Sequence, residues 1–142
     1  MVSDLLRRES GSSVEILTAS RPDIRVLSAI SVVMYGQGEP VAMIAITVQN
    51  HAPLAVFLMG VQIELEDGQH LFVQFDSATR QPNGRRRLES GDSFDFHVHM
   101  DDVRRAVEPE SLRRVVVRDA VGRIYHSDEE NFKQQIRILS QT

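Results

Sequence analysis

The sequence predicts an all-β protein, mainly antiparallel, in which two sheets pack together as a sandwich within one domain. Short segments of alternating apolar and polar residues follow one another along the chain, with turn-forming residues between them, a pattern typical of sandwiches. The 142 residues are 42% hydrophobic but only 6% aromatic, so aliphatic side chains are expected to build most of the core. Two sheets are expected because each strand has one apolar face that needs cover.

The first half of the chain carries four alternating segments. Residues 24–32 and 41–49 have apolar side chains at every second position, a period that predicts strands. A third segment, 54–66, ends in strict alternation, and Asp67-Gly68 leads directly into a fourth at 71–75. An Asp-Gly pair between two such segments predicts a hairpin closed by a type I′ turn, in which both central residues have positive φ.

The second half of the chain combines polar loops with further strands. Residues 76–92 are polar and rich in turn-forming residues, so we expect a long loop there. Apolar residues at every second position from 94 to 100 predict a strand with one face in water. Two more segments, 112–119 and 123–126, are separated by Ala120-Val121-Gly122 and are expected to form a second hairpin.

A short helix is expected near 101–108. Either Asp101 or Asp102 is the expected N-cap, because a carboxylate at that position accepts hydrogen bonds from free backbone N–H groups of the first turn. Pro109 is expected to end this helix, since proline lacks the N–H group that a continuing helix requires.

A second helix is expected over 128–139, near the C-terminal end. Ser127 and Glu130 have the spacing of a capping box, in which each side chain bonds a free backbone amide of the first turn. Apolar residues then recur at i, i+4 and i+7, the spacing of one helical face. We therefore divide the chain into a short helical or flexible segment, 1–20, and a single sandwich domain, 21–142, that includes this helix.

Part of the chain resembles a known class of module. The strand Ile44-Ala45-Ile46-Thr47-Val48-Gln49-Asn50, the following Pro53, the next apolar strand and Asp67-Gly68 are similar to the middle strands of immunoglobulin-like modules in bacterial proteins. The resemblance implies an immunoglobulin-like β-sandwich. It implies no catalytic residues, because a fold does not define a function.

The composition argues against several classes of function. The formal net charge is −4, whereas proteins that bind nucleic acids usually carry a basic excess. There is no cysteine, which excludes disulfides, thiolate metal sites and cysteine nucleophiles. The sequence contains no apolar segment of roughly 18 residues, no Gly-x-Ser-x-Gly elbow and no Gly-rich phosphate loop. We therefore expect a cytoplasmic, non-enzymatic protein with no cofactor, no membrane contact and no nucleic acid partner.

A nearly continuous apolar segment is the first candidate functional feature. It contains Leu54, Val56, Phe57, Leu58 and Met59, whereas a strand with one face in water should alternate. Two interpretations are open. The strand is covered on both sides within the monomer, or it forms an interface with a partner protein or with a second copy of the chain. The second interpretation makes the protein an assembly module, with a homodimer as its simplest form.

Four arginines in the expected loop are candidate anion ligands. They are Arg80, Arg85, Arg86 and Arg87, and guanidinium groups bind oxyanions through paired hydrogen bonds. The alternative is a solvated loop in which nearby carboxylates balance the positive charge.

His97 and His99 form a candidate metal site. Residues two apart on a strand project from the same face, so both imidazoles can reach one ion, and Asp95 and Asp101 continue the same spacing. The alternative is that these polar residues form the wet side of a strand. The sequence thus predicts a protein-interaction or assembly module, with a metal- or anion-binding domain as the alternative.

Overall fold

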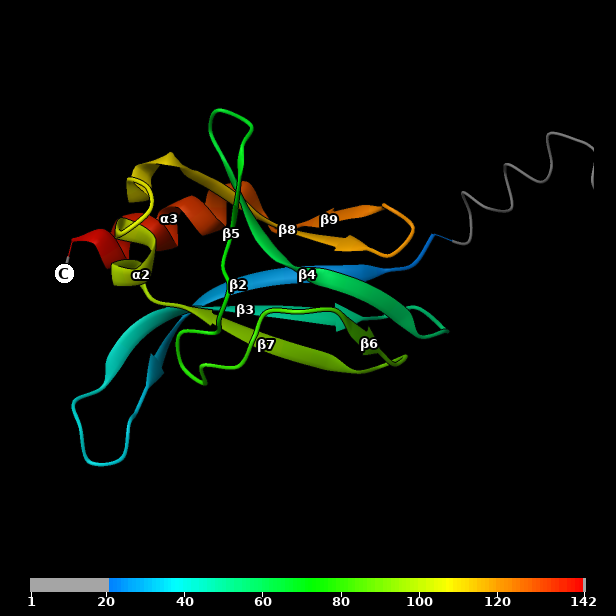
Figure 1. Ribbon diagram of the computed structural model, residues 1–142, viewed down its shortest axis with the longest axis horizontal. Helices are drawn as coiled ribbons and strands as arrows, with labels where there is room; N and C mark the ends of the chain where they lie inside the picture. The colour runs from blue at the N-terminus through cyan, green and yellow to red at the C-terminus, as the bar shows by residue number, and fades with distance from the viewer. Residues whose placement is uncertain (1–20, 142) are drawn as a thin grey trace, which may run out of the picture.

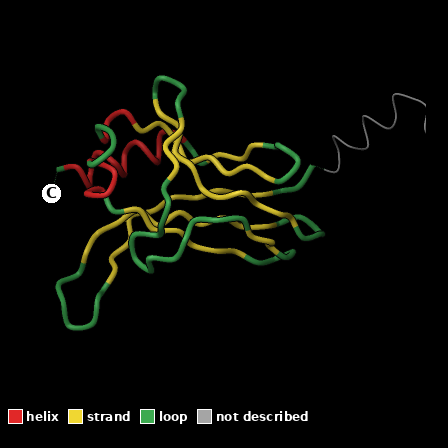
Figure 2. The backbone as a smooth tube through the Cα atoms, in the orientation of Figure 1, coloured by secondary structure: helices red, strands yellow, loops and turns green. Residues whose placement is uncertain are grey.

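The computed structural model describes residues 21–141, and the expected segment 1–20 lies outside them. Within the described residues the chain is mostly antiparallel β-structure in two sheets, with a helix near the C-terminal end (Figure 1). The predicted class, all-β and mainly antiparallel, is confirmed at this level. Figure 2 shows that the loops gather mainly at the ends of the strands.

The smaller sheet has three strands in the order β2-β3-β7. These are β2 (Ile24–Val33), β3 (Val41–Asn50) and β7 (Ser93–Val98), and both neighbouring pairs are antiparallel. The two strands predicted first in the sequence are confirmed, and they form one long hairpin whose tip projects from the sandwich (Figure 1).

The larger sheet has five strands. Its main order is β5-β4-β8-β9, and β6 pairs with β4 as well. The strands are β4 (Val56–Leu65), β5 (His70–Phe72), β6 (Arg86–Leu88), β8 (Leu112–Asp119) and β9 (Ile124–His126). The predicted hairpin of β8 and β9 is confirmed.

Aliphatic side chains from the inner faces of the two sheets form the core, as the low aromatic content predicts. Burying one such side chain fully is worth about 1.5–3 kcal/mol, so these contacts hold the two sheets together. The fully buried strand residues include Ile44, Ile46, Val48 and Val98 from the smaller sheet and Leu58, Val61, Ile63, Val115 and Val117 from the larger one.

Three helical segments lie on the remaining surfaces. The helix α3 (Glu129–Ser140) packs against β8 and β2 through an apolar stripe that includes the buried Phe132 and Ile136. The short helix α2 (Met100–Arg104) and the 3-10 helix η1 (Pro109–Ser111) connect β7 to β8. Figure 1 shows α2 and α3 at the same end of the molecule, away from β6 and the β8–β9 turn.

The short helix is confirmed, but its predicted limits are wrong. Its N-cap is His99, whose Nδ1 accepts the backbone N–H of Asp101 at 2.9 Å, rather than Asp101 or Asp102. Pro109 does not end this helix but begins η1. An imidazole can accept this bond as well as a carboxylate can, and the helix therefore begins at Met100, before both of the predicted N-caps.

The C-terminal helix is confirmed, but the predicted capping box is wrong. The side chain of Asp128, not Ser127, caps the helix by accepting the N–H of Asn131 at 2.9 Å. The Ser127 hydroxyl instead accepts the N–H of Val115 at 3.0 Å, and Ser127 is buried. The Ser127 hydroxyl, which the local pattern assigned to the helix cap, therefore accepts a hydrogen bond from a backbone amide of the central strand β8.

The Asp-Gly hairpin is confirmed between β4 and β5, but the predicted turn type is wrong. Only Gly68 has a positive φ, 88°, whereas Asp67 does not. The N–H of Gly68 donates to the carbonyl of Leu65 at 2.9 Å, and the N–H of Leu65 donates to the carbonyl of Gln69 at 2.8 Å. These bonds describe a turn followed by a left-handed glycine, another common way to close a hairpin.

The polar stretch 76–92 is mostly loop, as predicted, but it also contains the short strand β6, which the sequence did not predict. β6 and β5 pair with opposite halves of β4, and the side chain of Asn83 fills the gap between them. Its Nδ2 donates to the carbonyls of Val61 at 2.8 Å and Val73 at 2.6 Å, and its Oδ1 accepts the N–H of Val61 at 2.9 Å. Gly60 has φ +124°, and a Cβ there would lie 3.2 Å from Asn83 Oδ1, so this close approach favours glycine.

Candidate functional site

The side chain of Asp76 organises the loop that follows β5. It is buried, with 4% of its surface exposed. One oxygen accepts the backbone N–H groups of Ala78 at 2.7 Å and Thr79 at 2.8 Å. The other accepts the N–H of His97 at 2.9 Å and lies 3.1 Å from Nδ1 of the same histidine. A carboxylate with four donors fixes the loop against β7.

Two opposing effects act on the pKa of Asp76. Burial raises it, and the hydrogen bonds from Thr79, His97 and Ala78 lower it. The hydrogen bonds prevail, so the pKa of Asp76 lies below its ordinary value of 3.8. Because the ionised carboxylate can only accept hydrogen bonds, the contact with His97 requires a hydrogen on Nδ1 of the imidazole ring. The other ring nitrogen, Nε2, takes no part in this contact.

Ser77, next in the chain, bonds three residues from other parts of the chain. Its hydroxyl donates to the carboxylate of Asp102 at 2.8 Å and accepts the backbone N–H of His99 at 3.0 Å. The hydroxyl of Tyr35 donates to the Ser77 carbonyl at 3.0 Å. A serine nucleophile requires a base that takes its proton, and here the proton points to a carboxylate that is also held by Arg105. This arrangement suits a structural role for Ser77.

The two histidines of the candidate metal site have different local roles. The strand ends at Val98, and Asp101 lies on α2, so the expected row of polar residues on one strand face stops at His97. His99 uses Nδ1 to cap α2, and in the neutral ring the remaining proton is then on Nε2. Among residues 21–141, no group of three or more histidine or carboxylate side chains could hold a metal ion. The metal site stays a prediction without a third ligand.

The four candidate anion ligands do not share one site. The guanidinium of Arg86 lies 3.8 Å from the ring centroid of Phe94, and that of Arg87 lies 5.8 Å from the ring centroid of Phe57. Arg87 also forms an ion pair with Glu89. Arg85 is exposed. The fourth, Arg80, lines a separate cavity between α2 and the segment that follows β5.

The apolar segment at the start of β4 is divided between inside and outside. Val56 and Leu58 are buried in the core, whereas Phe57 and Met59 are 48% and 39% exposed and Leu54 lies exposed in the preceding loop. Neither interpretation of the sequence holds for the whole segment. One face of the strand is covered within the monomer, and the other face is uncovered.

The uncovered face belongs to a wider surface on the outside of the larger sheet. Phe57 lies opposite Arg87 on β6, and Phe72 on β5 lies opposite Gln62 of β4. Four large apolar side chains are exposed on this face, and we call them the outer apolar patch: Phe57, Met59, Phe72 and Ile124. The patch spans three strands, so its shape is set by the rigid sheet and not by a loop.

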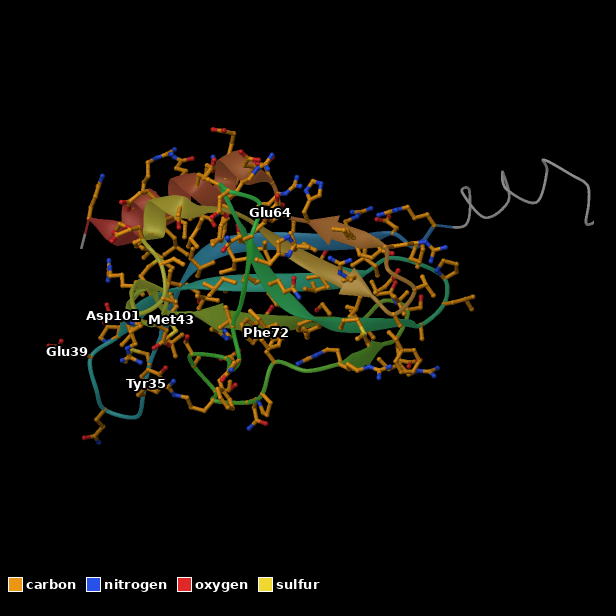
Figure 3. All side chains as sticks on the ribbon, turned by 45° about the horizontal axis from the view of Figure 1, so that its top comes forward. Tyr35, Glu39, Met43, Glu64, Phe72 and Asp101 are labelled. Carbon is orange, nitrogen blue, oxygen red and sulfur yellow. The ribbon has the colours of Figure 1, made fainter. Side chains whose placement is uncertain are left out.

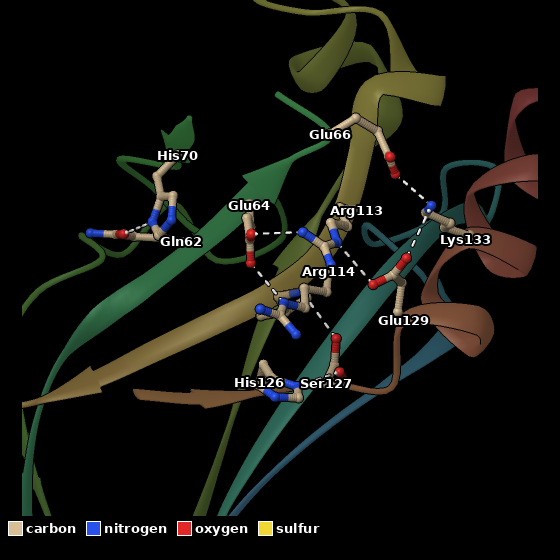
Figure 4. A network of polar contacts seen from close by, with 11 residues as sticks. Gln62, Glu64, Glu66, His70, Arg113, Arg114, His126, Ser127, Glu129 and Lys133 are labelled. Carbon is tan, nitrogen blue, oxygen red and sulfur yellow. Dashed lines mark hydrogen bonds and ion pairs between the residues drawn. The ribbon is translucent and has the colours of Figure 1, made fainter. Parts of the chain in front are cut away.

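A network of ion pairs occupies the other end of the same sheet face (Figure 4). Glu64 on β4 accepts hydrogen bonds from Nε of Arg114 at 2.7 Å and from Nη1 of Arg113 at 3.2 Å. Arg113 also binds Glu129 at 2.9 Å, and Lys133 binds Glu129 at 3.2 Å. The hydrogen bond from Arg114 is the main cause that lowers the pKa of Glu64. The network joins α3 to the sheet.

Sequence reasoning missed the residues that organise the site, in particular Asp76, Asp102 and Arg105. A local signal existed for the first of them, since an aspartate followed by small residues commonly forms a turn by bonding the next backbone amides. No local signal existed for Asp102 or Arg105, because only the fold brings α2 beside the loop. In Figure 3, Tyr35 and Asp101, which come from distant parts of the chain, lie at the same end of the molecule.

Comparison with known proteins adds no further constraint. The chain matches no protein-family model, and no curated protein shows significant sequence similarity to it. In the part of the chain that the structure describes, no helix has the length and apolar character needed to cross a membrane.

Proposed function

We propose that the chain is a non-enzymatic protein-interaction module that assembles as a homodimer through the outer apolar patch. The exposure of Phe57 and Met59 on β4 is the observation that carries the proposal. An apolar patch on a regular surface often marks a contact with another protein. Aromatic side chains, methionine and arginine are also enriched at the centres of such contacts.

A second copy of the chain is the simplest partner, because a two-fold axis lets the same apolar surface cover itself. The acidic side chains at the far end of β4 are already paired within the chain: Glu64 binds Arg113 and Arg114, and Glu66 binds Lys133. At the near end Arg87 is paired with Glu89. The apolar side chains, and not the charged ones, are therefore expected to meet across the axis.

The proposal includes an immunoglobulin-like sandwich in a cytoplasmic protein. The strand order supports the first part, because β2-β3-β7 corresponds to strands A, B and E of immunoglobulin domains and β4-β8-β9 corresponds to C, F and G. β6 has no counterpart in that scheme.

Cell fractionation of the native host tests the proposed cytoplasmic location, and recovery of the chain with the membrane or outside the cell would contradict it.

Light scattering after size exclusion tests the assembly. We expect the wild-type chain to elute as a dimer and Phe57→Asp to elute as a folded monomer, because a carboxylate at the centre of the contact cannot be buried without a partner. Val32→Asp is the matched control. It also places a carboxylate at an exposed apolar position on a strand, but on the smaller sheet.

Circular dichroism must show that each variant is folded. Should Phe57→Asp fail to fold, Phe57→Ser and Met59→Ser provide milder changes at the same face. A wild-type monomer at high protein concentration would refute the proposal. A dimer that survives Phe57→Asp but is lost with Val32→Asp would refute it too, and would place the contact on β2.

A further inference from the structure

A cavity of about 270 Å³ lies between α2 and the segment that follows β5. Its walls combine apolar and polar side chains in similar measure, and two of the apolar ones, Val98 and Val103, belong to the buried core. Phe72 and Phe75 are each about half exposed beside it. Ligand sites in proteins are typically apolar hollows of roughly 300–1,000 Å³ with a few polar groups at defined places. At about 270 Å³ this cavity lies just below that range, which limits it to a small ligand. Its apolar lining is Leu71, Phe72, Val73, Phe75, Val98, Val103 and Ala106.

Two arginines line the cavity and are exposed to solvent. Arg80 and Arg105 line this cavity and also the adjoining hollow beside Tyr35 and Met43. The side chain of Arg80 has no ion pair or hydrogen bond with any residue from 21 to 141. Arg105 is 79% exposed along its side chain and lies 3.3 Å from one oxygen of Asp102. The other oxygen of Asp102 accepts the hydroxyl of Ser77.

The charged groups that line the cavity leave an excess of one positive charge. Asp102 offsets one of the two guanidinium groups, and no second carboxylate lines the cavity itself. Asp101, which lines the adjoining hollow, is paired with Arg104. A ligand with a single negative charge neutralises this excess, whereas a doubly charged phosphate would exceed it. Arginine is suited to the task, because its planar group presents paired N–H donors to a carboxylate.

The backbone of Arg80 is held in place before any ligand arrives. It is the one non-glycine residue with positive φ in the described part of the chain, at 63°. Its N–H donates to the carbonyl of Asp76 at 2.9 Å, and the buried carboxylate of Asp76 fixes the preceding turn. Non-glycine residues keep such a conformation where surrounding contacts impose it, and they occur often at functional sites.

We propose that this cavity binds a small amphipathic carboxylate, with its apolar body between α2 and the 71–75 segment and its carboxylate on Arg80 and Arg105. The inference does not depend on the outer apolar patch. The two features lie on different sets of residues apart from Phe72, and the ligand needs no second copy of the chain.

Calorimetric titration with sodium octanoate, below the concentration at which it forms micelles, tests the proposal. We expect saturable one-to-one binding by octanoate and none by octanol, which has the same chain without the charge, or by inorganic phosphate, which has charge without the chain. Arg80→Gly should weaken octanoate binding about tenfold or more, because it removes a charged hydrogen-bond donor. Glycine accepts the positive φ at this position, so the variant should fold.

Arg85→Ala is the matched control, since Arg85 is an exposed arginine of the same chain segment that does not line the cavity. It should bind octanoate as the wild type does. Ala106 lines the cavity just after the end of α2, and Ala106→Phe, which fills the cavity with a large side chain, should abolish binding. Absence of octanoate binding, equal binding of octanol, or unchanged binding by Arg80→Gly would each overturn the proposal. Binding of phosphate without binding of octanoate would contradict the proposal that the cavity holds the apolar body of a ligand.

Discussion

The carboxylate of Asp76 accepts the backbone N–H of His97 and also contacts Nδ1 of the same side chain, and so joins the loop after β5 to β7. The same carboxylate closes the turn that leads to Arg80. One buried side chain therefore determines where Ser77 and Arg80 lie.

Asp76→Asn should lower the free energy of unfolding by about 1–3 kcal/mol, because a buried, charged hydrogen-bond acceptor is replaced by a neutral group with one oxygen. Urea unfolding at neutral pH measures the change. Asp92→Asn is the control, since Asp92 is exposed and a surface change of this kind should stay within about 0.5 kcal/mol. Equal effects of the two substitutions would contradict a structural role for Asp76.

The contribution of Asp76 should disappear in acid. Its folded-state pKa lies below 3.8, so the ionised form stabilises the fold fully above that value, and the stabilisation is lost as the pH falls through the lowered pKa. The difference in unfolding free energy between wild type and Asp76→Asn should be constant from pH 7 to about pH 5 and should shrink below about pH 4. A difference that stays constant down to the acid unfolding transition would show that the charge of Asp76 is irrelevant.

Tyr125 should make the fold sensitive to alkali. Burial, and then the hydrogen bond that its hydroxyl donates to Asp119 at 2.8 Å, raise the pKa of Tyr125 to about 12. A raised folded-state pKa gives stabilisation that is complete below the ordinary value of 10.0 and is lost as the pH rises through about 12. Ultraviolet titration of Tyr35→Phe, which leaves Tyr125 as the single tyrosine, measures this pKa. A transition near 10 would contradict the buried contact.

Asn83→Ala should destabilise the larger sheet. The change leaves the N–H and carbonyl of Val61 and the carbonyl of Val73 without the partners that Asn83 provides, at a cost of about 2–3 kcal/mol. Gln69→Ala, at an exposed position in the β4–β5 turn, is the control. Amide hydrogen exchange should show that the N–H of Val61 exchanges faster in the variant than in the wild type. Retained protection there would mean that another group takes over the bond.

Gly60→Ala extends the test of this contact. An added Cβ would meet Asn83 Oδ1 at 3.2 Å, at a backbone φ of +124° that favours glycine, so the substitution should destabilise the fold through both effects. In an Asn83→Ala background the contact with Oδ1 is gone, and the additional cost of Gly60→Ala should be smaller. Strictly additive costs would show that the two residues do not interact.

Local patterns were sufficient where one segment decides its own conformation. The alternation over 41–49 predicted β3, because successive side chains of any strand point to opposite faces. The apolar spacing over 128–139 predicted α3 for a similar reason. Caps and turns were less predictable. Ser127 had the right spacing for a helix cap, and a longer-range partner, Val115, took its hydroxyl instead.

The sequence by itself determined the class of fold, the order of most strands along the chain and the apolar residues available for a core. The tertiary structure alone decided which of them remain uncovered, so that Val56 and Leu58 are buried while Phe57 and Met59 face outward. It alone brought Arg105 to the same cavity as Arg80 and buried Asp76 against His97. The physical reason is that periodicity records the two faces of a strand, whereas exposure and clustering depend on what other elements pack against each face.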